Sequence, residues 1–126
     1  MLKTIILIAV GGALGAVMRF LSQATIYELV GRSFPFGTMF VNVTGSFLMG
    51  LLSIFLVEKF NLGAEWHMAI LIGVLGSFTT FSTFSLETIT LLENGQLAHA
   101  GAYVVMSAVL CVTMAGAGIW LARTLA

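Results

Sequence analysis

The sequence predicts an all-α membrane protein with four transmembrane helices, the third of which is broken near its centre. Of its 126 residues, 60% are hydrophobic and only 8% are charged, which is far more apolar than a soluble domain. The apolar residues fall into four stretches, each long enough to cross a hydrocarbon core of about 30 Å. Because the connections between them are short, neighbouring helices should run antiparallel.

We expect residues 1–126 to form a single four-helix transmembrane domain. The first span is too long for a signal peptide, so we interpret it as a retained helix. Polar breaks and the only proline separate the spans. The expected spans run from about Thr4 to Val30, Thr38 to Val57, Trp66 to Leu92 and Ala100 to Ala122.

The first span carries small residues one turn apart at Gly11 and Gly15, a pattern typical of close helix packing. It also contains Arg19. An arginine near the centre of a membrane helix costs about 2.5–3.5 kcal/mol, so Arg19 should reach an aqueous cavity, where it would concentrate anions. A structural ion pair with Glu87 or Glu28 is the alternative.

The second span contains one carboxamide, Asn42, in its apolar part, and the small pair Ser46 and Gly50. A buried amide needs partners, and its NH2 group offers two donors. Asn42 therefore either presents donors to an anion or joins two membrane helices.

The third span contains Gly73, Gly76 and Ser77 near its centre, and glycines with hydroxyl residues weaken a helix. A helix that opens there frees backbone carbonyls at membrane depth, and half-helix carbonyl ends commonly hold a small cation such as sodium. The alternative is that the glycines only let another helix approach closely.

Residues 77–85 repeat one pattern three times: Ser-Phe-Thr, Thr-Phe-Ser and Thr-Phe-Ser. Each hydroxyl carries a donor, and each phenyl ring has a weakly positive edge. At about 100° per residue, Phe78, Phe81 and Phe84 form a slowly drifting stripe flanked by hydroxyls. Such a stripe offers an anion donors without a fixed positive charge. Glu87 follows the repeat directly. Three roles stay open for it: a proton carrier, a hydrogen-bonded vestibule group or an ion-pair partner.

In the fourth span, Tyr103, Ser107 and Cys111 recur every four residues and share one helix face. This polar face either continues an ion pathway or makes hydrogen bonds between helices. Cys111 is the only cysteine, which excludes disulfides within the chain and cysteine-rich metal sites.

The charged residues suggest how the chain assembles. The net charge is zero, which excludes a basic nucleic-acid surface. Lys3, Lys59 and Arg123 fall on one side and Arg32 on the other, so the termini should lie inside, but so few charges leave insertion in both orientations open. Four helices alone cannot enclose a polar pathway and seal it from lipid, so we expect an oligomer.

Three blocks of sequence resemble the small bacterial fluoride channels, the Fluc family, also called CrcB. They are Gly-Gly-Ala-Leu-Gly-Ala-Val-Met-Arg-Phe at 11–20, Gly-Thr-Met-Phe-Val-Asn-Val-Thr-Gly-Ser at 37–46, and Gly-Val-Leu-Gly-Ser-Phe-Thr-Thr-Phe-Ser-Thr-Phe-Ser-Leu-Glu at 73–87. The third block is very specific, and together they cover essentially the whole chain.

The resemblance implies a passive, fluoride-selective channel of the bacterial inner membrane, not an enzyme, that exports fluoride and protects against its toxicity. It implies an antiparallel dual-topology homodimer surrounded by lipid, with two pores and a central structural sodium ion. Sodium would be bound by the carbonyls of Gly76 and Thr79. The implied pore residues are Phe81, Phe84 and Asn42 with the hydroxyls of Ser82 and Thr83; the implied vestibule and polar track are Arg19, Thr38, Glu87, Tyr103 and Ser107.

Three other functions are weaker interpretations of the residues. A small proton-coupled multidrug exporter needs an acid in its binding cavity, and the first two spans have no central acid. A scaffold subunit leaves the hydroxyl and phenyl repeat without a use. A membrane enzyme is disfavoured because no nucleophile with a base and no multi-ligand metal cluster stands out.

Overall fold

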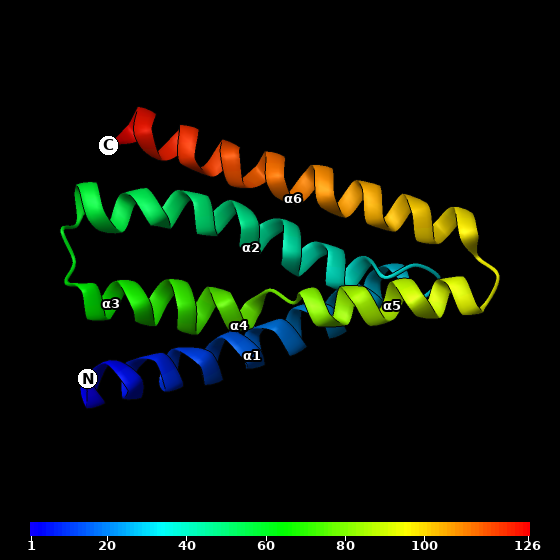
Figure 1. Cartoon of the computed structure of the whole chain (residues 1–126), viewed down its shortest axis with the longest axis horizontal. Helices are drawn as coiled ribbons and strands as arrows, with labels where there is room; N and C mark the ends of the chain where they lie inside the picture. The colour runs from blue at the N-terminus through cyan, green and yellow to red at the C-terminus, as the bar shows by residue number, and fades with distance from the viewer.

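The computed structural model describes all 126 residues as four membrane-length helical spans lying side by side (Figure 1). All four are long and apolar enough to cross a bilayer, and their ends differ from the predicted ends by no more than three residues. Both chain termini lie at the same end of the bundle. The elements are α1 (Leu2–Val30), α2 (Phe36–Ile54) with the π-helical η1 (Phe55–Lys59), α3 (Ala64–Met68), the π-helical η2 (Ala69–Leu75), α4 (Gly76–Phe78), α5 (Phe81–Glu93) and α6 (Leu97–Leu125).

Two turns at the end of the bundle opposite the chain termini depend on glycine. Gly31 ends α1 with φ 84°, and Gly95 has φ 74° in the turn between α5 and α6. Both values lie in the left-handed region, which glycine adopts without a side-chain clash. These turns reverse the chain in a few residues, as the predicted antiparallel arrangement requires.

The third span breaks at Thr79 and Thr80, between α4 and α5. Thr79 has φ −83° and ψ 158°, and Thr80 has φ −152° and ψ 111°, so both are extended. The predicted break is therefore present, but it follows the glycines instead of lying on them. Gly76 is helical, and a Cβ on Gly73 would meet the carbonyl of Ile8 in α1. Gly73 thus serves close packing.

Small residues set the helix contacts. Gly11 and Gly15 of α1 face the backbone of η2, where a Cβ on either would meet backbone atoms. In the same way Gly50 of α2 faces the carbonyl of Ala115 in α6, and Gly118 faces Phe47. The small-residue pairs of spans one and two thus contribute to ordinary helix packing, with helix axes brought close by the missing side chains.

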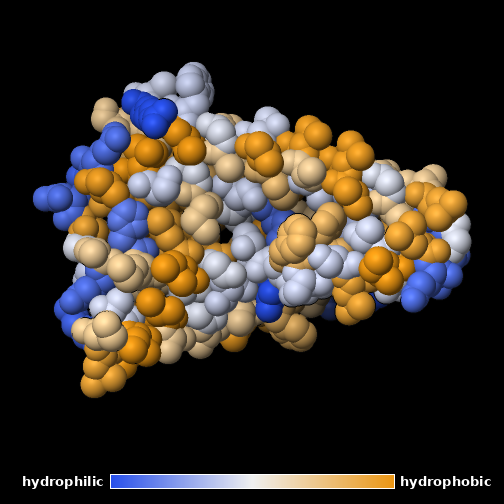
Figure 2. Space-filling view, in the orientation of Figure 1, coloured by the Kyte–Doolittle hydropathy of each residue, from blue (hydrophilic) through white to orange (hydrophobic).

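Most of the large apolar residues point outward. Only 21 of the 126 residues are buried, which is too few for a soluble core and suits a chain whose apolar surface contacts lipid. Figure 2 shows hydrophobic residues over much of one face, hydrophilic residues gathered towards the two ends, and a hollow near the middle with hydrophilic atoms beside it. On this face, the hydrophilic atoms at mid-height lie beside the hollow.

Substitution of Gly50 by alanine should destabilise the bundle by about 1–3 kcal/mol, because the added methyl group meets the Ala115 carbonyl, which no rotamer change can move. The matched change Gly116→Ala meets nothing within 4 Å and should stabilise α6 by up to about 1 kcal/mol. Thermal unfolding in detergent measures both. Equal melting temperatures for the two variants would contradict this packing.

Candidate functional site

Asn42 of α2 bridges the break in the third span. Its Nδ2 donates to the Thr80 carbonyl at 3.0 Å, and its Oδ1 accepts from the Thr80 amide at 2.7 Å. The side chain thus replaces both hydrogen bonds that Thr80 loses by leaving the helix. One N–H of the amide remains free. Asn42 therefore joins two helices and still has one N–H without a partner.

Thr80 also begins α5. Its Oγ1 accepts from the Thr83 amide at 3.2 Å, as an N-cap residue does. The same oxygen lies 2.9 Å from Thr83 Oγ1 and 3.4 Å from Ser82 Oγ. The hydroxyls that open α5 are therefore held partly by one another.

The carbonyl groups that precede the break have no donor within the chain. The last backbone hydrogen bond at the C-terminal end of α4 runs from the Thr79 amide to the Leu75 carbonyl at 3.0 Å. The amide of Thr80, which would reach Gly76 in a continuous helix, bonds to Asn42 instead. The carbonyls of Gly76, Ser77, Phe78 and Thr79 consequently accept no hydrogen bond. They are free oxygen ligands at mid-span.

A groove of about 520 Å³ lies beside the break, between α2, α5 and α6. Phe81 is 78% exposed at its edge, whereas Phe84 is half-buried and packs against Phe81 with ring centroids 5.5 Å apart. The buried Ser107 Oγ has no hydrogen-bond partner. The groove is lined by Asn42, Gly45, Ser46, Met49, Thr79, Thr80, Phe81, Phe84, Val104, Ser107, Ala108, Cys111, Val112 and Ala115. Aromatic rings, an amide and a free hydroxyl thus share one cavity.

Glu87 is held by hydroxyl groups from two other helices. Thr38 Oγ1 donates to Oε1 at 2.6 Å, and the Tyr103 hydroxyl donates to Oε2 at 2.9 Å. Both donors are fully buried. The Tyr103 ring also packs against Phe84 in a T-shaped arrangement, with centroids 4.9 Å apart. Phe84, Tyr103 and Glu87 therefore connect the groove with the next cavity along the span.

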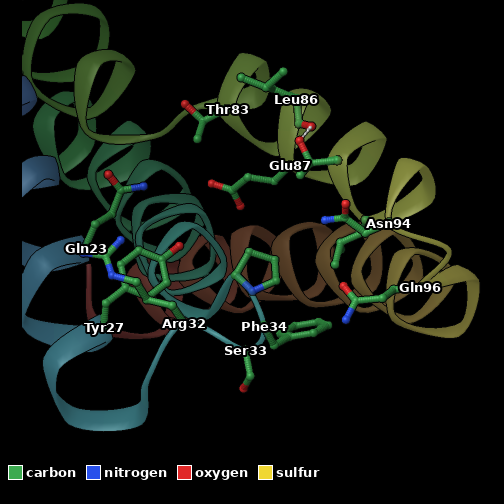
Figure 3. Close-up of a pocket in the computed structure, with 13 residues that line it drawn as sticks. Gln23, Tyr27, Arg32, Ser33, Phe34, Thr83, Leu86, Glu87, Asn94 and Gln96 are labelled. Carbon is green, nitrogen blue, oxygen red and sulfur yellow. Dashed lines mark hydrogen bonds between the residues drawn. The ribbon is translucent and has the colours of Figure 1, made fainter.

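That second cavity, of about 440 Å³, opens at the end of the bundle where α5 turns into α6 (Figure 3). The Glu87 carboxylate points into it, between Thr83 on one side and Gln23 on the other. The guanidinium of Arg32 lies 4.8 Å from the centroid of the Tyr27 ring at its wall. The cavity is polar and reaches the carboxylate from outside.

The structure brings together most, but not all, of the predicted site residues. Phe81, Phe84, Asn42 and Ser107 share the groove, and Thr38, Glu87 and Tyr103 share one hydrogen-bonded cluster. Thr83 lines the cavity at Glu87 instead of the groove, and Ser82 is exposed and lines neither. Arg19 is half-buried on α1 and lines neither as well, and it forms no ion pair with Glu87 or Glu28.

Two residues of the site are missing from the sequence interpretation. Thr80 was predicted only as part of the repeat, although a hydroxyl residue three positions before Thr83 at a helix start is an N-cap signal. Gln23 donates to Thr38 Oγ1 at 3.0 Å. Its signal is the spacing of Arg19, Gln23 and Tyr27, which places three polar side chains on one face of α1.

Comparison with known proteins decides the family. Residues 6–119 match the family described as CrcB-like protein, Camphor Resistance (CrcB). The chain belongs to the CrcB family. This agrees with the resemblance found in the three sequence blocks.

Several relatives in the CrcB family are named fluoride-specific ion channel FluC. The protein of Methylococcus capsulatus is 52% identical over 119 residues, and the chain spans only 52% of that relative's length. The protein of Syntrophotalea carbinolica is 46% identical over 121 residues, 96% of this chain and 98% of the relative. That of Geobacter sulfurreducens is 46% identical over 124 residues, 98% of this chain and 100% of the relative. These relatives are named as ion channels, not as enzymes.

The four spans and the CrcB relatives together identify a multi-pass protein of the bacterial cell membrane. The break, the groove and the Glu87 cluster lie within the matched residues. They therefore belong to the part of the chain that the CrcB family shares.

Replacement of Asn42 by leucine should destabilise the break, because it leaves the Thr80 amide and carbonyl without partners. Each unsatisfied buried group costs about 1–3 kcal/mol. Hydrogen exchange of the Thr80 amide, followed by mass spectrometry, should become faster in Asn42→Leu than in Asn42→Asp, which keeps the acceptor. Unchanged exchange in the leucine variant would contradict the bridging role.

Proposed function

We propose that the protein is a passive, fluoride-selective channel that exports fluoride and so protects the cell from its toxicity. The observation that carries the proposal is the groove beside the break, where the buried Ser107 hydroxyl has no partner and Asn42 keeps one free N–H. A free donor at membrane depth is costly unless something accepts from it. An anion is such an acceptor, and the names of the relatives single out fluoride.

The chemistry of the groove suits a small, strongly hydrated anion. Hydroxyls, an amide and the edges of Phe81 and Phe84 can replace water around the ion. No lysine or arginine lines the groove, so the ion meets no fixed charge that would hold it too tightly. Conduction requires binding that is strong enough to admit the ion and weak enough to release it.

The pathway would continue from the groove past Phe84 to the cluster at Glu87. Ser107 and Tyr103 lie four residues apart on one face of α6, and Tyr103 contacts both Phe84 and Glu87. Thr38 and Tyr103 would line the pathway at this point, and they would donate to the ion only by releasing Glu87, which now accepts from both. In the proposed roles Ser82 and Thr83 add hydroxyls at the start of α5, and Arg19 raises the local anion concentration at the vestibule.

The groove also supports a homodimer. Phe81 is 78% exposed, and the polar lining opens outward where lipid would otherwise lie. Because lipid satisfies no polar group, another protein surface should cover it. A second copy inserted in the opposite orientation would cover the groove of the first copy and have its own groove covered in return. The dimer would then have two pores. One four-helix domain per subunit is sufficient for this arrangement.

A central sodium ion would satisfy the free carbonyls at the break. Gly76 and Thr79 each have a carbonyl without a donor, and such carbonyls at half-helix ends are the usual ligands of sodium in membrane proteins. Two copies around a two-fold axis would supply four oxygens. The bound charge would join the subunits and make the nearby potential more favourable for an anion.

Liposomes that contain the purified protein should release fluoride rapidly and chloride at the rate of empty liposomes, followed with ion-selective electrodes. Substitution of Phe81 and Phe84 together by isoleucine should slow fluoride release by at least roughly tenfold, because aliphatic side chains have no positive edge.

The control for this experiment is Phe20→Ile, which removes an exposed ring of α1 that lines neither cavity. Its fluoride release should equal that of the unmodified protein. Fast chloride release, or no fluoride release above empty liposomes, would overturn the proposed function. Undiminished flux in the double variant would remove the two rings from the pathway.

Removal of sodium during purification, with a large organic cation in its place, should shift the protein from dimer to monomer in detergent. The reason is that four carbonyl oxygens would then face one another without a cation between them. Size-exclusion chromatography with light scattering measures the mass of the protein. A dimer that is equally stable without sodium would count against the central ion, and a monomer in sodium would count against the dimer.

A further inference from the structure

Gln23 has no role in the pathway proposed above, yet its side chain is joined to the Glu87 cluster. It lies half-buried on α1 and lines the polar cavity into which the carboxylate of Glu87 points (Figure 3). Its Nε2 donates to Thr38 Oγ1 at 3.0 Å. Thr38 in turn donates to Glu87 at 2.6 Å. Three helices are thereby connected by one chain of hydrogen bonds.

The direction of this chain follows from the number of protons. A threonine hydroxyl has a single hydrogen, and Thr38 is fully buried, so water does not compete for it. The amide nitrogen of Gln23 can only donate. Thr38 Oγ1 must therefore accept from Gln23 and give its own hydrogen to Glu87. With the Tyr103 hydroxyl on the other oxygen, the carboxylate of Glu87 accepts from both sides.

The reverse arrangement would change what Glu87 can do. A hydrogen-bond acceptor at position 23 would take the hydrogen of Thr38. Glu87 could then keep its contact with Thr38 only by carrying a proton itself. The side chain at position 23 thus sets both the direction of the Thr38 hydroxyl and the role of Glu87.

We propose that Gln23 is a positioning residue that fixes Thr38 as a donor towards Glu87 and keeps the carboxylate an acceptor at this point of the fluoride pathway. The inference rests on the proposed function only for its effect on flux. A hydroxyl that accepts one hydrogen bond is a stronger donor in the next. Gln23 thereby also strengthens the hydrogen bond from Thr38 to Glu87.

Two substitutions that keep the size of the side chain at position 23 distinguish the direction of the hydrogen bond to Thr38 from side-chain packing. Gln23→Met removes the donor and should slow fluoride efflux by roughly threefold at every pH. Gln23→Glu introduces an acceptor and should slow efflux by roughly tenfold in mildly alkaline buffer. Acidic buffer should restore most of the flux in Gln23→Glu, because a protonated carboxyl group donates to Thr38 again.

Gln96 provides the matched control, since it lines the same cavity and its side chain makes no hydrogen bond to Thr38. Gln96→Met and Gln96→Glu should conduct like the unmodified protein. The other titratable or charged groups that line this cavity or bond to the Glu87 carboxylate are Tyr27, Arg32 and Tyr103, and they are the same in all variants. A flux in Gln23→Glu that does not depend on pH beyond that of Gln96→Glu would overturn the proposal.

Infrared spectroscopy tests the same contact without any transport. The carboxylate band of Glu87 is the one that disappears in Glu87→Gln. It should shift in Gln23→Met, where the Thr38 hydrogen bond weakens, and stay in place in Gln96→Met. An unchanged band in Gln23→Met would overturn the inference even in a protein that conducts fluoride. A shifted band in a protein without fluoride flux would support the positioning role of Gln23 and contradict the proposed channel function.

Discussion

Every backbone polar group at membrane depth must find a partner inside the protein, and the break at Thr79 and Thr80 is organised by this constraint. Asn42 bonds to both backbone groups of Thr80, and the Thr80 hydroxyl begins the next helix. The four carbonyls from Gly76 to Thr79 accept no hydrogen bond within the chain. The break therefore creates both a stable start for α5 and a set of oxygen atoms that a single chain does not satisfy.

The same constraint explains where the polar side chains lie. They follow the helices from the groove at Ser107 to the cluster at Glu87, and the apolar residues cover most of the remaining surface. Glu87 points into the polar cavity, but both of its carboxylate oxygens already accept hydrogen bonds from Thr38 and Tyr103. That arrangement disfavours the proton-coupled exporter, which needs an acid that is free to bind its substrate.

Much of the fold followed from the sequence because composition and span length are strong signals in membrane proteins. The repeat at 77–85 singled out Phe81 and Phe84, and both line one groove. The exact position of the break did not follow, since glycines favour close packing and helix opening alike, and the contact with Ile8 decides between them. The helical spacing on α1 marks Gln23 as one of three polar side chains on one face. It does not reveal the hydrogen bond to Thr38, because Thr38 lies on another helix.

The third span is shared between two neighbours. Its first half, α3 to α4, packs on α1, and its second half, α5, packs on α6. The third span is thus two helical halves joined by two extended residues, and the side chain of Asn42 bonds to the second of them. A substitution in α5 would therefore act on the groove and on α6 directly, whereas one in η2 would first disturb the glycine contacts with α1. The break is in this sense a boundary between a half of the span that shapes the groove and a half that packs on α1.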